Sequence, residues 1–297
     1  MRNHPQFKAY AALASVCFFW GTTYLAIRIA LEAFSPAVLV SLRFWLAGLA
    51  MLALVRALGH SLPRGRDLWF TALFGALILG GGNGALVYSE SIIPSSLAAL
   101  FITLSPFWFA AIEAAVPGGE PLRAPVLGGI VCGFTGVALL IVPDLWRQGV
   151  SGSVWKGFLL LQFGSLSWVL GSVLQKRRAV AAHPFAVGAV QQLAAGVLFT
   201  VPALLESDAR WDWSATQGVW AVAYLVTFGS VIGFSSYIYA LEKLPVAMVS
   251  LYTYINPVVA AALGWLVYRE PFGRMEIAAM SIVFAGVWAV KRSSVRR

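Results

Sequence analysis

The chain has 297 residues, of which 60% are hydrophobic and only 11% are charged. A soluble globular protein carries about 25% charged residues, so this sequence lacks the polar side chains that would cover a fold in water. Ten membrane-spanning helices of about 20 residues each would use most of the length and leave only short loops. The composition therefore excludes a soluble catalytic or regulatory domain and predicts a multi-pass protein whose solvent is the lipid bilayer.

The formal net charge is +9, but the lysines and arginines are scattered over predicted loops and form no continuous patch. Nucleic acid is therefore not an expected partner. The chain has two cysteines, both in apolar runs, and three histidines, all in tails or loops. This distribution predicts neither a disulfide framework nor a zinc site, and we expect no metal and no cofactor.

Apolar runs bounded by charged residues, proline and glycine recur along the whole chain. They lack the period-two alternation of barrel strands and are typical of helices, so we predict an all-α membrane protein. The ten predicted spans, in chain order, are 9–29, 36–56, 68–88, 94–116, 123–142, 153–175, 184–205, 215–240, 245–267 and 274–290.

The second half of the chain repeats residues of the first half at a nearly constant offset of about 150 positions. The matching pairs are Trp20 and Trp168, Arg28 and Lys176, Pro36 and Pro184, Arg43 and Gln191, Pro94 and Pro245, Pro106 and Pro257, Glu120-Pro121 and Glu270-Pro271, and Gly136 and Gly286. Five spans per copy is an odd number, so the second copy would enter the membrane from the opposite side, as in many secondary transporters. We therefore predict two inverted five-helix repeats, 1–149 (helices 1–5) and 150–297 (helices 6–10).

The loop charges predict the orientation of these repeats. Fourteen lysines and arginines fall on the side that bears both termini, and six fall on the opposite side. Positively charged loops stay in the cytoplasm, so we expect both termini there.

The Trp20-Gly21 pair, Pro36 followed by Arg43-Phe44, the span that holds Pro94 and Pro106, and the Glu-Pro turns resemble EamA-type carriers of the drug/metabolite transporter superfamily. The resemblance covers essentially the whole chain, and its motifs specify the fold better than the substrate. Within the superfamily, the size and the aromatic-rich interior look most like bacterial amino-acid exporters of the YddG type. The resemblance implies a secondary transporter of the bacterial inner membrane that exports small metabolites, above all amino acids including aromatic and hydrophobic ones, by alternating access. We expect it to work as a monomer.

Two prolines fall about twelve residues into their spans, near the middle of the bilayer: Pro106 and Pro257. A proline inside a helix removes a backbone hydrogen bond and leaves a carbonyl in need of a polar neighbour. Each is preceded by a polar residue, Ser105 or Asn256. Either the prolines are structural kinks, or the helices bend around a cavity and present Ser105 and Asn256 to a substrate; both can hold at once.

Glycines at a spacing of four mark two further spans: Gly80 and Gly84 before Tyr88, and Gly229 and Gly233 before Tyr237. Small residues at this spacing let helices approach closely, and a tyrosine beside them can offer a ring and a hydroxyl to a ligand. The glycine pattern pairs Tyr88 with Tyr237, whereas the proline offset pairs it with Tyr239, and the sequence leaves both pairings open. The predicted flex points for alternating access are Pro106, Pro257, Gly84 and Gly233.

Trp20 and Trp168 lie near the centre of their spans, where interfacial anchoring does not explain them. They either pack in the core or line a central cavity. The aromatic and amide residues that we expect beside them in such a cavity are Tyr24, Asn83 and Tyr252.

Arg43 lies about seven residues, or roughly 10 Å, inside its span. It either snorkels to the headgroups or faces the cavity and attracts a substrate carboxylate. Glu113 is the one carboxylate well inside a predicted span, near the cytoplasmic end. We therefore expect no proton relay at the midplane and transport that is facilitated or weakly coupled.

Other functions are less consistent with the sequence. No His-Glu-x-x-His motif, Gly-x-Ser-x-Gly elbow or Gly-x-x-x-x-Gly-Lys-Ser/Thr phosphate loop occurs, so we expect neither an enzyme nor an ATP-driven pump. The alternatives that stay open are efflux of neutral amphipathic drugs or other metabolites, and a gated channel.

Overall fold

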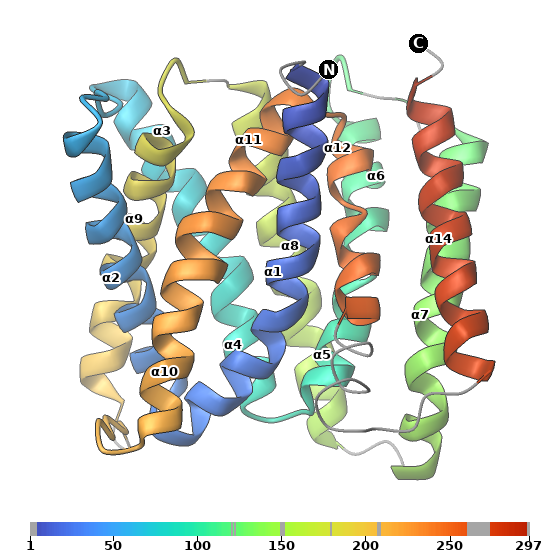
Figure 1. Cartoon of the computed structure of the whole chain (residues 1–297), viewed down its shortest axis with the longest axis horizontal. Coiled ribbons are helices and arrows are strands. Elements are labelled where there is room, and N and C mark those ends of the chain that lie inside the picture. The colour runs from blue at the N-terminus through green and yellow to red at the C-terminus, as the bar shows by residue number, and fades with distance from the viewer. Residues whose placement is uncertain are drawn as a thin grey trace.

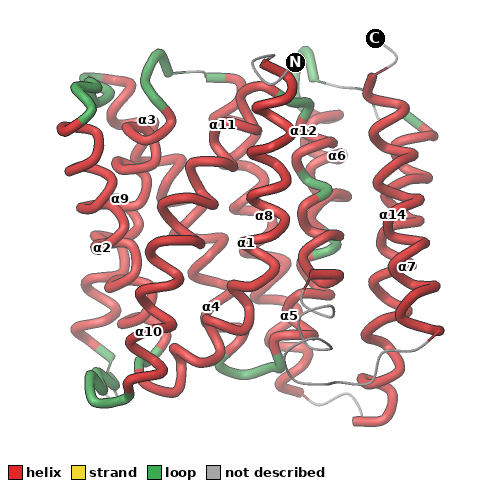
Figure 2. The backbone as a smooth tube through the Cα atoms, in the orientation of Figure 1, coloured by secondary structure: helices red, strands yellow, loops and turns green. Residues whose placement is uncertain are grey.

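The computed structural model describes residues 5–119, 121, 123–148, 152–178, 180–206, 209–259 and 274–295. Within these ranges the chain is a bundle of helices joined by short loops (Figures 1 and 2). The strand-like pairing found in them is a single antiparallel bridge between Phe34 and Trp211. The prediction of an all-α fold is confirmed for the part of the chain that the structure describes.

The first half of the chain forms a long helix pair followed by segmented helices. In chain order the elements are α1 (Pro5–Ala33), α2 (Pro36–Ala57), α3 (Arg66–Gly75), the π-helical η1 (Ala76–Asn83), α4 (Gly84–Glu90), α5 (Ser95–Ile102), α6 (Ser105–Ala115) and α7 (Ala124–Gln148).

The second half follows the same order of long and segmented helices. Its elements are α8 (Gly152–Arg177), α9 (Pro184–Leu205), α10 (Thr216–Tyr224), the π-helical η2 (Leu225–Phe234), α11 (Ser235–Lys243), α12 (Val246–Val249), a helix over 252–259 and α14 (Arg274–Val295).

Seven helical segments of the described residues are long and apolar enough to cross a membrane, and three shorter apolar helices accompany them. The shorter ones are Ala124–Leu139, Val246–Val259 and Ile277–Ala289. These ten segments coincide with the predicted spans, but the exact number of crossings stays a prediction. Part of the predicted span 245–267, Glu120 and the Glu270-Pro271 turn lie outside the described residues.

The two halves interlock, because the first helix of each half packs against helices of the other half. Helix α1 packs against α10, η2 and α11 of the second half, while α8 packs against α3, η1 and α4 of the first half. Helix α2 lies along α9, and α7 lies along α14. The start of α1 and the end of α14 lie at the same end of the bundle (Figure 1).

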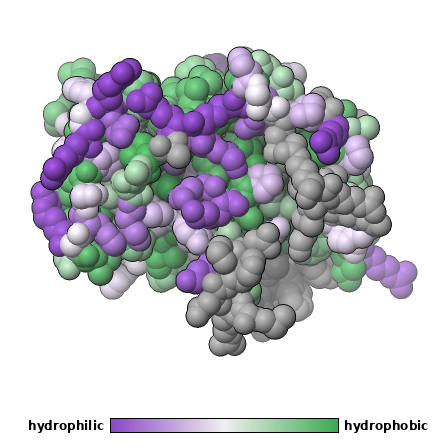
Figure 3. Space-filling model, turned by 90° about the horizontal axis from the view of Figure 1, so that it is seen from above, coloured by the Kyte–Doolittle hydropathy of each residue, from purple (hydrophilic) through white to green (hydrophobic). Residues whose placement is uncertain are grey.

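The outer surface is apolar along the helices. Large side chains with more than half of their area exposed include Trp69, Trp155, Trp220, Phe163 and Leu205. In the view from above, hydrophilic side chains spread across the end of the bundle where α1 begins (Figure 3). An apolar surface along the helices with a polar end is the distribution that a lipid bilayer requires of a protein that crosses it.

The hydropathy pattern predicted that the third and eighth spans are helices throughout. In the structure, these two spans are not continuous α-helices. Each contains a π-helical segment, η1 or η2, at a corresponding place in its half. Two glycines of η1 lie against α8: a Cβ on Gly81 would be 2.1 Å from Oγ of Ser167, and one on Gly82 would be 2.8 Å from Cε3 of Trp168. π-Helical turns are rare and occur often at functional sites, and both segments border the cavity described below.

The fourth span is interrupted, and so is its counterpart in the second half. Helix α5 ends at Ile102, and α6 begins at Ser105 after a two-residue turn; α12 ends at Val249, and the next helix begins at Tyr252. Hydroxyl groups at the breaks bond back to the preceding turn, Thr103 Oγ1 to Leu100 O at 2.5 Å in the first and Ser250 Oγ to Ala247 O at 3.1 Å in the second. Such side-chain bonds compete with the helical ladder.

The prolines relate differently to these breaks. Pro106 lies in the first turn of α6, where its missing N–H costs nothing. Pro257 is the sixth residue of the helix over 252–259, seven positions after its break begins at Ser250. The proline pattern therefore indicated the right spans, but only Pro106 adjoins the interruption itself.

Candidate functional site

A cavity lies at the centre of the bundle between the two halves. Its walls come from α1, α2, η1, α4 and α5–α6 of the first half and from α8, η2 and the helix over 252–259 of the second. Eight of the ten predicted binding residues line it: Trp20, Tyr24, Arg43, Asn83, Ser105, Trp168, Tyr252 and Asn256.

Aromatic side chains gather around Trp20. Its ring centroid lies 5.4 Å from that of Trp168, 5.2 Å from that of Tyr237 and 5.0 Å from that of Tyr252. Trp168 and Tyr252 meet Trp20 edge to face, at interplanar angles of 84°. Edge-to-face pairs of this kind stabilise by about 0.5–1.5 kcal/mol each beyond the area that they bury. We call these four rings the aromatic cluster; Trp20, Trp168 and Tyr252 line the cavity.

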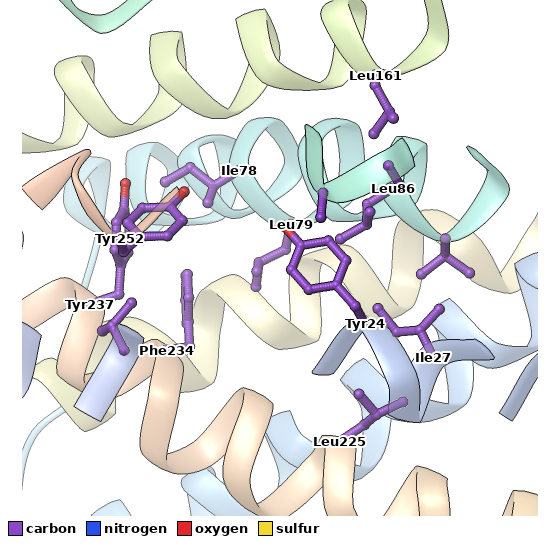
Figure 4. Packing of buried hydrophobic residues seen from close by; sticks show 14 of the residues in the cluster. Tyr24, Ile27, Ile78, Leu79, Leu86, Leu161, Leu225, Phe234, Tyr237 and Tyr252 are labelled. Atoms are coloured by element: carbon purple, nitrogen blue, oxygen red, sulfur yellow. The ribbon is translucent and has the colours of Figure 1, made fainter. Parts of the chain in front are cut away.

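The polar side-chain atoms of Trp20, Trp168 and Tyr237 are bonded within the protein. Trp20 Nε1 donates to Gly229 O at 2.9 Å, and Trp168 Nε1 donates to the Tyr237 hydroxyl at 3.0 Å. The Tyr237 hydroxyl is also 2.7 Å from Ser172 Oγ. Figure 4 shows Tyr237, Tyr252 and Phe234 together on one side and Tyr24, Leu79 and Leu86 on the other. The cluster is therefore a rigid apolar surface that leaves ring faces and edges for a ligand.

Arg43 is 4% exposed and lines the cavity rather than reaching the headgroups. Its Nε donates to Ser230 Oγ at 2.9 Å, and its Nη1 donates to Asn83 Oδ1 at 3.3 Å. These acceptors lie in η2 and η1, so one guanidinium joins the two π-helical segments across the halves. A guanidinium has five N–H groups, and the bonds to described residues occupy two of them. The remainder can bind a carboxylate.

Asn256 and Ser105, the residues before the two prolines, both face the cavity. With its amide nitrogen toward the acceptors, Asn256 donates to Cys17 O at 3.0 Å and Tyr252 O at 2.9 Å. Ser105 Oγ donates to Ser165 Oγ at 3.2 Å. These side chains therefore bond to nearby polar groups and also form part of the cavity wall, while their presentation to a substrate stays a prediction.

Two predicted residues are not part of the cavity lining. Tyr237 is 0% exposed and contributes through the aromatic cluster from behind. Tyr88 does not line this cavity, because it is half-buried and packs toward Phe199 of α9, with ring centroids 6.4 Å apart. Its role in substrate binding stays a prediction. A Cβ on Gly84 would meet the same Phe199 at 2.5 Å. The stripe of Gly80, Gly84 and Tyr88 therefore faces α9, not the cavity.

Gly233, by contrast, belongs to the cavity side, where a Cβ would lie 2.6 Å from Trp20 Nε1. Gly84 and Gly233 thus serve close packing in this conformation. Their role as flex points, with that of Pro106 and Pro257, stays a prediction.

The sequence reading missed Glu90. Placed beyond the predicted span 68–88, it is in fact the last residue of α4 and is 0% exposed. Neither carboxylate oxygen has a hydrogen-bond partner. Glu113, the carboxylate well inside a predicted span, pairs with Arg177 at 3.0 Å. The signal for Glu90 was a charged residue four positions after cavity-lining Leu86, on the same helical face.

No group of three or more histidine, cysteine or carboxylate residues that could hold a metal ion occurs in the described part of the chain. The cavity instead combines one guanidinium, amide and hydroxyl groups, and aromatic rings. That chemistry suits the reversible binding of a small polar molecule with an apolar part.

Comparison with known proteins identifies the family. The model of the EamA-like transporter family matches the chain twice, over residues 7–142 and 155–292. The chain is 32% identical over 290 residues to the "Uncharacterized inner membrane transporter YedA" of Escherichia coli, covering 97% of this chain and 92% of the relative. It is 26% identical over 291 residues to a "Probable terminal-alkyne amino-acid exporter" of Streptantibioticus cattleyicolor, covering 98% and 95%.

A solved crystal structure shares the fold with a TM-score of 0.81 at 21% identity, covering 97% of this chain and 98% of that one. The duplicated family match and the relative that is 32% identical agree with the helical bundle and its apolar outer surface. The protein is a membrane transporter rather than an enzyme, and it belongs to the EamA-like transporter family.

Proposed function

We propose that this protein exports amino acids or closely related metabolites across the bacterial inner membrane as a secondary transporter. The observation that carries the proposal is that Arg43 and rings of the aromatic cluster line the same cavity. A guanidinium binds a carboxylate with geometric specificity, and the rings offer an apolar surface to a side chain. An amino acid with an aromatic or hydrophobic side chain has both parts.

The proposed mechanism is alternating access by two inverted five-helix repeats, 1–149 and 150–297, around this cavity. It is supported by the cross-packing of α1 and α8 on the opposite halves, and by the cavity walls that both halves supply. In inverted-repeat transporters the site lies near the midplane between the repeats. Because one chain encloses the whole cavity, we propose that the monomer is the working unit.

We propose that both termini are cytoplasmic. The excess of positive charge on the terminal side supports this orientation, and so does the location of the first and last helix ends at one end of the bundle (Figure 1). The inner-membrane location is that named for the Escherichia coli relative. The export direction is suggested by the name of the Streptantibioticus relative.

The test is a substrate panel on purified protein in liposomes. We expect saturable counterflow of labelled phenylalanine, competed by other amino acids but not by phenylethylamine, which lacks the carboxylate. Arg43→Gln should reduce counterflow about 10- to 150-fold, because a hydrogen bond to a charged group contributes about 1.5–3 kcal/mol. Arg56→Gln, an exposed arginine near the end of the same helix, is the matched control and should transport normally.

Linear, unsaturated flux would indicate a pore instead of a carrier. Equal competition by phenylethylamine and phenylalanine would contradict the role of Arg43. Transport of neutral amphipathic compounds in place of every amino acid tested would replace the proposed substrate class.

A further inference from the structure

A second hollow lies at the end of the bundle where α1 begins, apart from the central cavity. It lies between the start of α3, the end of α8, the start of α9 and the end of α11 (Figure 1). Its lining includes Phe74, Lys176 and Leu241, and none of its described lining residues also lines the central cavity. We call it the terminal hollow. In this conformation a molecule in the terminal hollow is therefore separated from the central cavity.

Three stretches of helix run from the central cavity to the terminal hollow. On each of them one residue lines the cavity and another lines the hollow. These pairs, with the cavity residue first, are Trp168 and Lys176 on α8, Phe234 and Leu241 on η2 and α11, and Leu79 and Phe74 on η1 and α3. The pair on α8 lies two helical turns apart, or about 12 Å. A thin layer of protein therefore separates two spaces that follow each other along the same helices.

The separating layer is fully buried and is held together by hydrogen bonds between α8 and α11. Ser172 of α8 and Tyr237 of α11 are each 0% exposed. The Tyr237 hydroxyl accepts from Trp168 Nε1 at 3.0 Å and is 2.7 Å from Ser172 Oγ. One turn further along α8, Lys176 Nζ donates to Leu241 O at 3.1 Å. Because Trp168, Ser172 and Lys176 follow at a spacing of four, one face of α8 is bonded to α11 through the whole layer.

The bonds of this layer are of a kind that can break and re-form during transport. Both bonds of the Tyr237 hydroxyl join neutral groups, and such bonds contribute only modestly to stability. Trp168 belongs to the layer and to the cavity, since its ring lines the cavity and its Nε1 donates to Tyr237. A ligand stacked on the Trp168 ring therefore acts directly on one of the two bonds.

We propose that the terminal hollow is the substrate entry at the end that bears both termini, and that the Tyr237 hydroxyl keeps the barrier between this entry and the central cavity closed. The inference rests on the proposed function, in which the carrier loads at the cytoplasmic end and exports. The charged residues that line the hollow are two cations, Lys176 and Arg178, and one carboxylate, Glu242, so the entry can hold the charged groups of an amino acid. Loading then requires α11 to part from α8 at Tyr237 and to close again before the other end opens.

The first experiment measures access across the barrier and needs no substrate. Ser165→Cys, combined with Cys17→Ala and Cys132→Ala, leaves one thiol, on the wall of the central cavity. The protein is placed in liposomes with its terminus-bearing end toward the medium, as shown by proteolytic removal of a carboxy-terminal tag. A small, charged methanethiosulfonate is then added. Tyr237→Phe keeps the ring and should speed labelling about tenfold, because the two hydrogen bonds of the hydroxyl are lost. Ser172→Ala removes one of them and should speed labelling about threefold.

Tyr239→Phe is the matched control, because Tyr239 lies on the same helix, is half-buried and is not part of the aromatic cluster. It should leave the labelling rate unchanged. If Tyr237→Phe does not fold, Ser172→Ala decides, since it removes only a hydroxyl from α8. An unchanged labelling rate in the folded variants would overturn the role of Tyr237 in the barrier.

The second experiment blocks the entry. Ala182→Cys in the protein without Cys17 and Cys132 places a thiol on the lining of the terminal hollow. A bulky maleimide attached there from the terminus-bearing side should reduce phenylalanine counterflow at least about tenfold relative to the untreated sample, because it fills the hollow. Leu58→Cys, at an exposed residue of the same end outside the hollow, is the control and should keep its counterflow after labelling.

The outcomes separate the two proposals. Absence of phenylalanine counterflow in the wild-type protein would overturn the proposed function, whereas the rate of thiol labelling is measured without any substrate. Full counterflow in the labelled Ala182→Cys protein, beside normal wild-type transport, would overturn only the assignment of the terminal hollow as the entry.

Discussion

Arg43 of α2 and Gln191 of α9 are counterparts in the two halves of the chain, yet they meet different surroundings. Arg43 lines the cavity and bonds to both π-helical segments. Gln191 is 0% exposed, donates to Gln175 Oε1 at 2.7 Å and packs against Gly75, away from the cavity. Trp20 and Trp168, by contrast, are counterparts that meet each other at 5.4 Å.

The difference distinguishes what both halves contribute to the cavity from what the first half contributes alone. The halves share the aromatic cluster, whereas the charges near the cavity, Arg43 and Glu90, both come from the first half. A duplicated fold thus supplies matching surfaces for stacking, and the asymmetry between the halves supplies the polarity that orients a ligand. Variants at these positions test the difference between the two halves.

The largest effect is expected from moving the charge to the second half. The double change Arg43→Gln with Gln191→Arg should not restore transport, because position 191 does not reach the cavity. Gln191→Arg alone should destabilise the protein by about 3–5 kcal/mol, the cost of an uncompensated buried charge. Thermal unfolding in detergent measures the second effect and liposome counterflow the first. Recovery of counterflow in the double variant would show that the two sites are equivalent.

Changes in the aromatic cluster should have more similar effects in the two halves. Trp20→Ala and Trp168→Ala should each weaken phenylalanine binding, by about tenfold for Trp20, which contacts three rings. The expected loss is smaller for an aliphatic amino acid such as leucine. Competition counterflow with both amino acids checks this. Trp288→Ala, on the exposed surface of α14, is the control, and equal loss in all three variants would contradict the stacking role.

Adding a single methyl group within either π-helical segment should moderately lower the stability of the folded protein. Gly82→Ala would place a Cβ 2.8 Å from Trp168, and Gly233→Ala would place one 2.6 Å from Trp20. Overpacking of this size costs about 1–3 kcal/mol, so both variants should unfold at lower temperature. Gly128→Ala in α7 is the control, since no atom lies within 4 Å of its added Cβ. Unchanged unfolding temperatures for both variants would show that the segments shift to make room for the added Cβ, and would contradict the prediction.

The smallest expected effect lies outside the membrane, at the stacked rings of His60 and His183, whose centroids are 4.1 Å apart. Burial, and secondly the charge of His60, lower the pKa of His183 from its usual 6.5. Neutral His183 therefore contributes stability that is complete above pH 6.5 and is lost as the pH falls through the lowered pKa. His60→Ala should raise the pKa of His183 partway, as measured by NMR titration; an unchanged pKa would contradict the pairing.

The sequence predicted the helical fold and most of the cavity lining for definable reasons. Hydropathy located the spans, and the offset between Trp20 and Trp168 related the halves. Depth within a span indicated which polar and aromatic residues lie near the middle. These are one-dimensional signals, and they hold wherever a helix is regular.

The remainder depends on which way a helix face points. Tyr88 and Tyr237 follow the same glycine spacing, but the first faces α9 and the second faces Trp20. The half-buried environment of Tyr88 outside the cavity matches that of Tyr239 better than that of Tyr237. Glu90 was missed because a hydropathy boundary at residue 88 placed it in a loop. No residue type distinguishes a π-helical turn from an α-helical one, so the sequence could not predict that η1 and η2 are π-helical.

The interrupted helices have an electrostatic consequence. Helix α6 begins at Ser105 and the helix over 252–259 begins at Tyr252, and both first residues line the cavity. The amino end of a helix carries a partial charge of roughly +0.5 from its aligned peptide dipoles. The carboxyl end of α5, at Ile102, borders the same cavity and carries the opposite partial charge. The interrupted backbone therefore offers both signs of partial charge within one space, which suits a ligand that carries both charges itself.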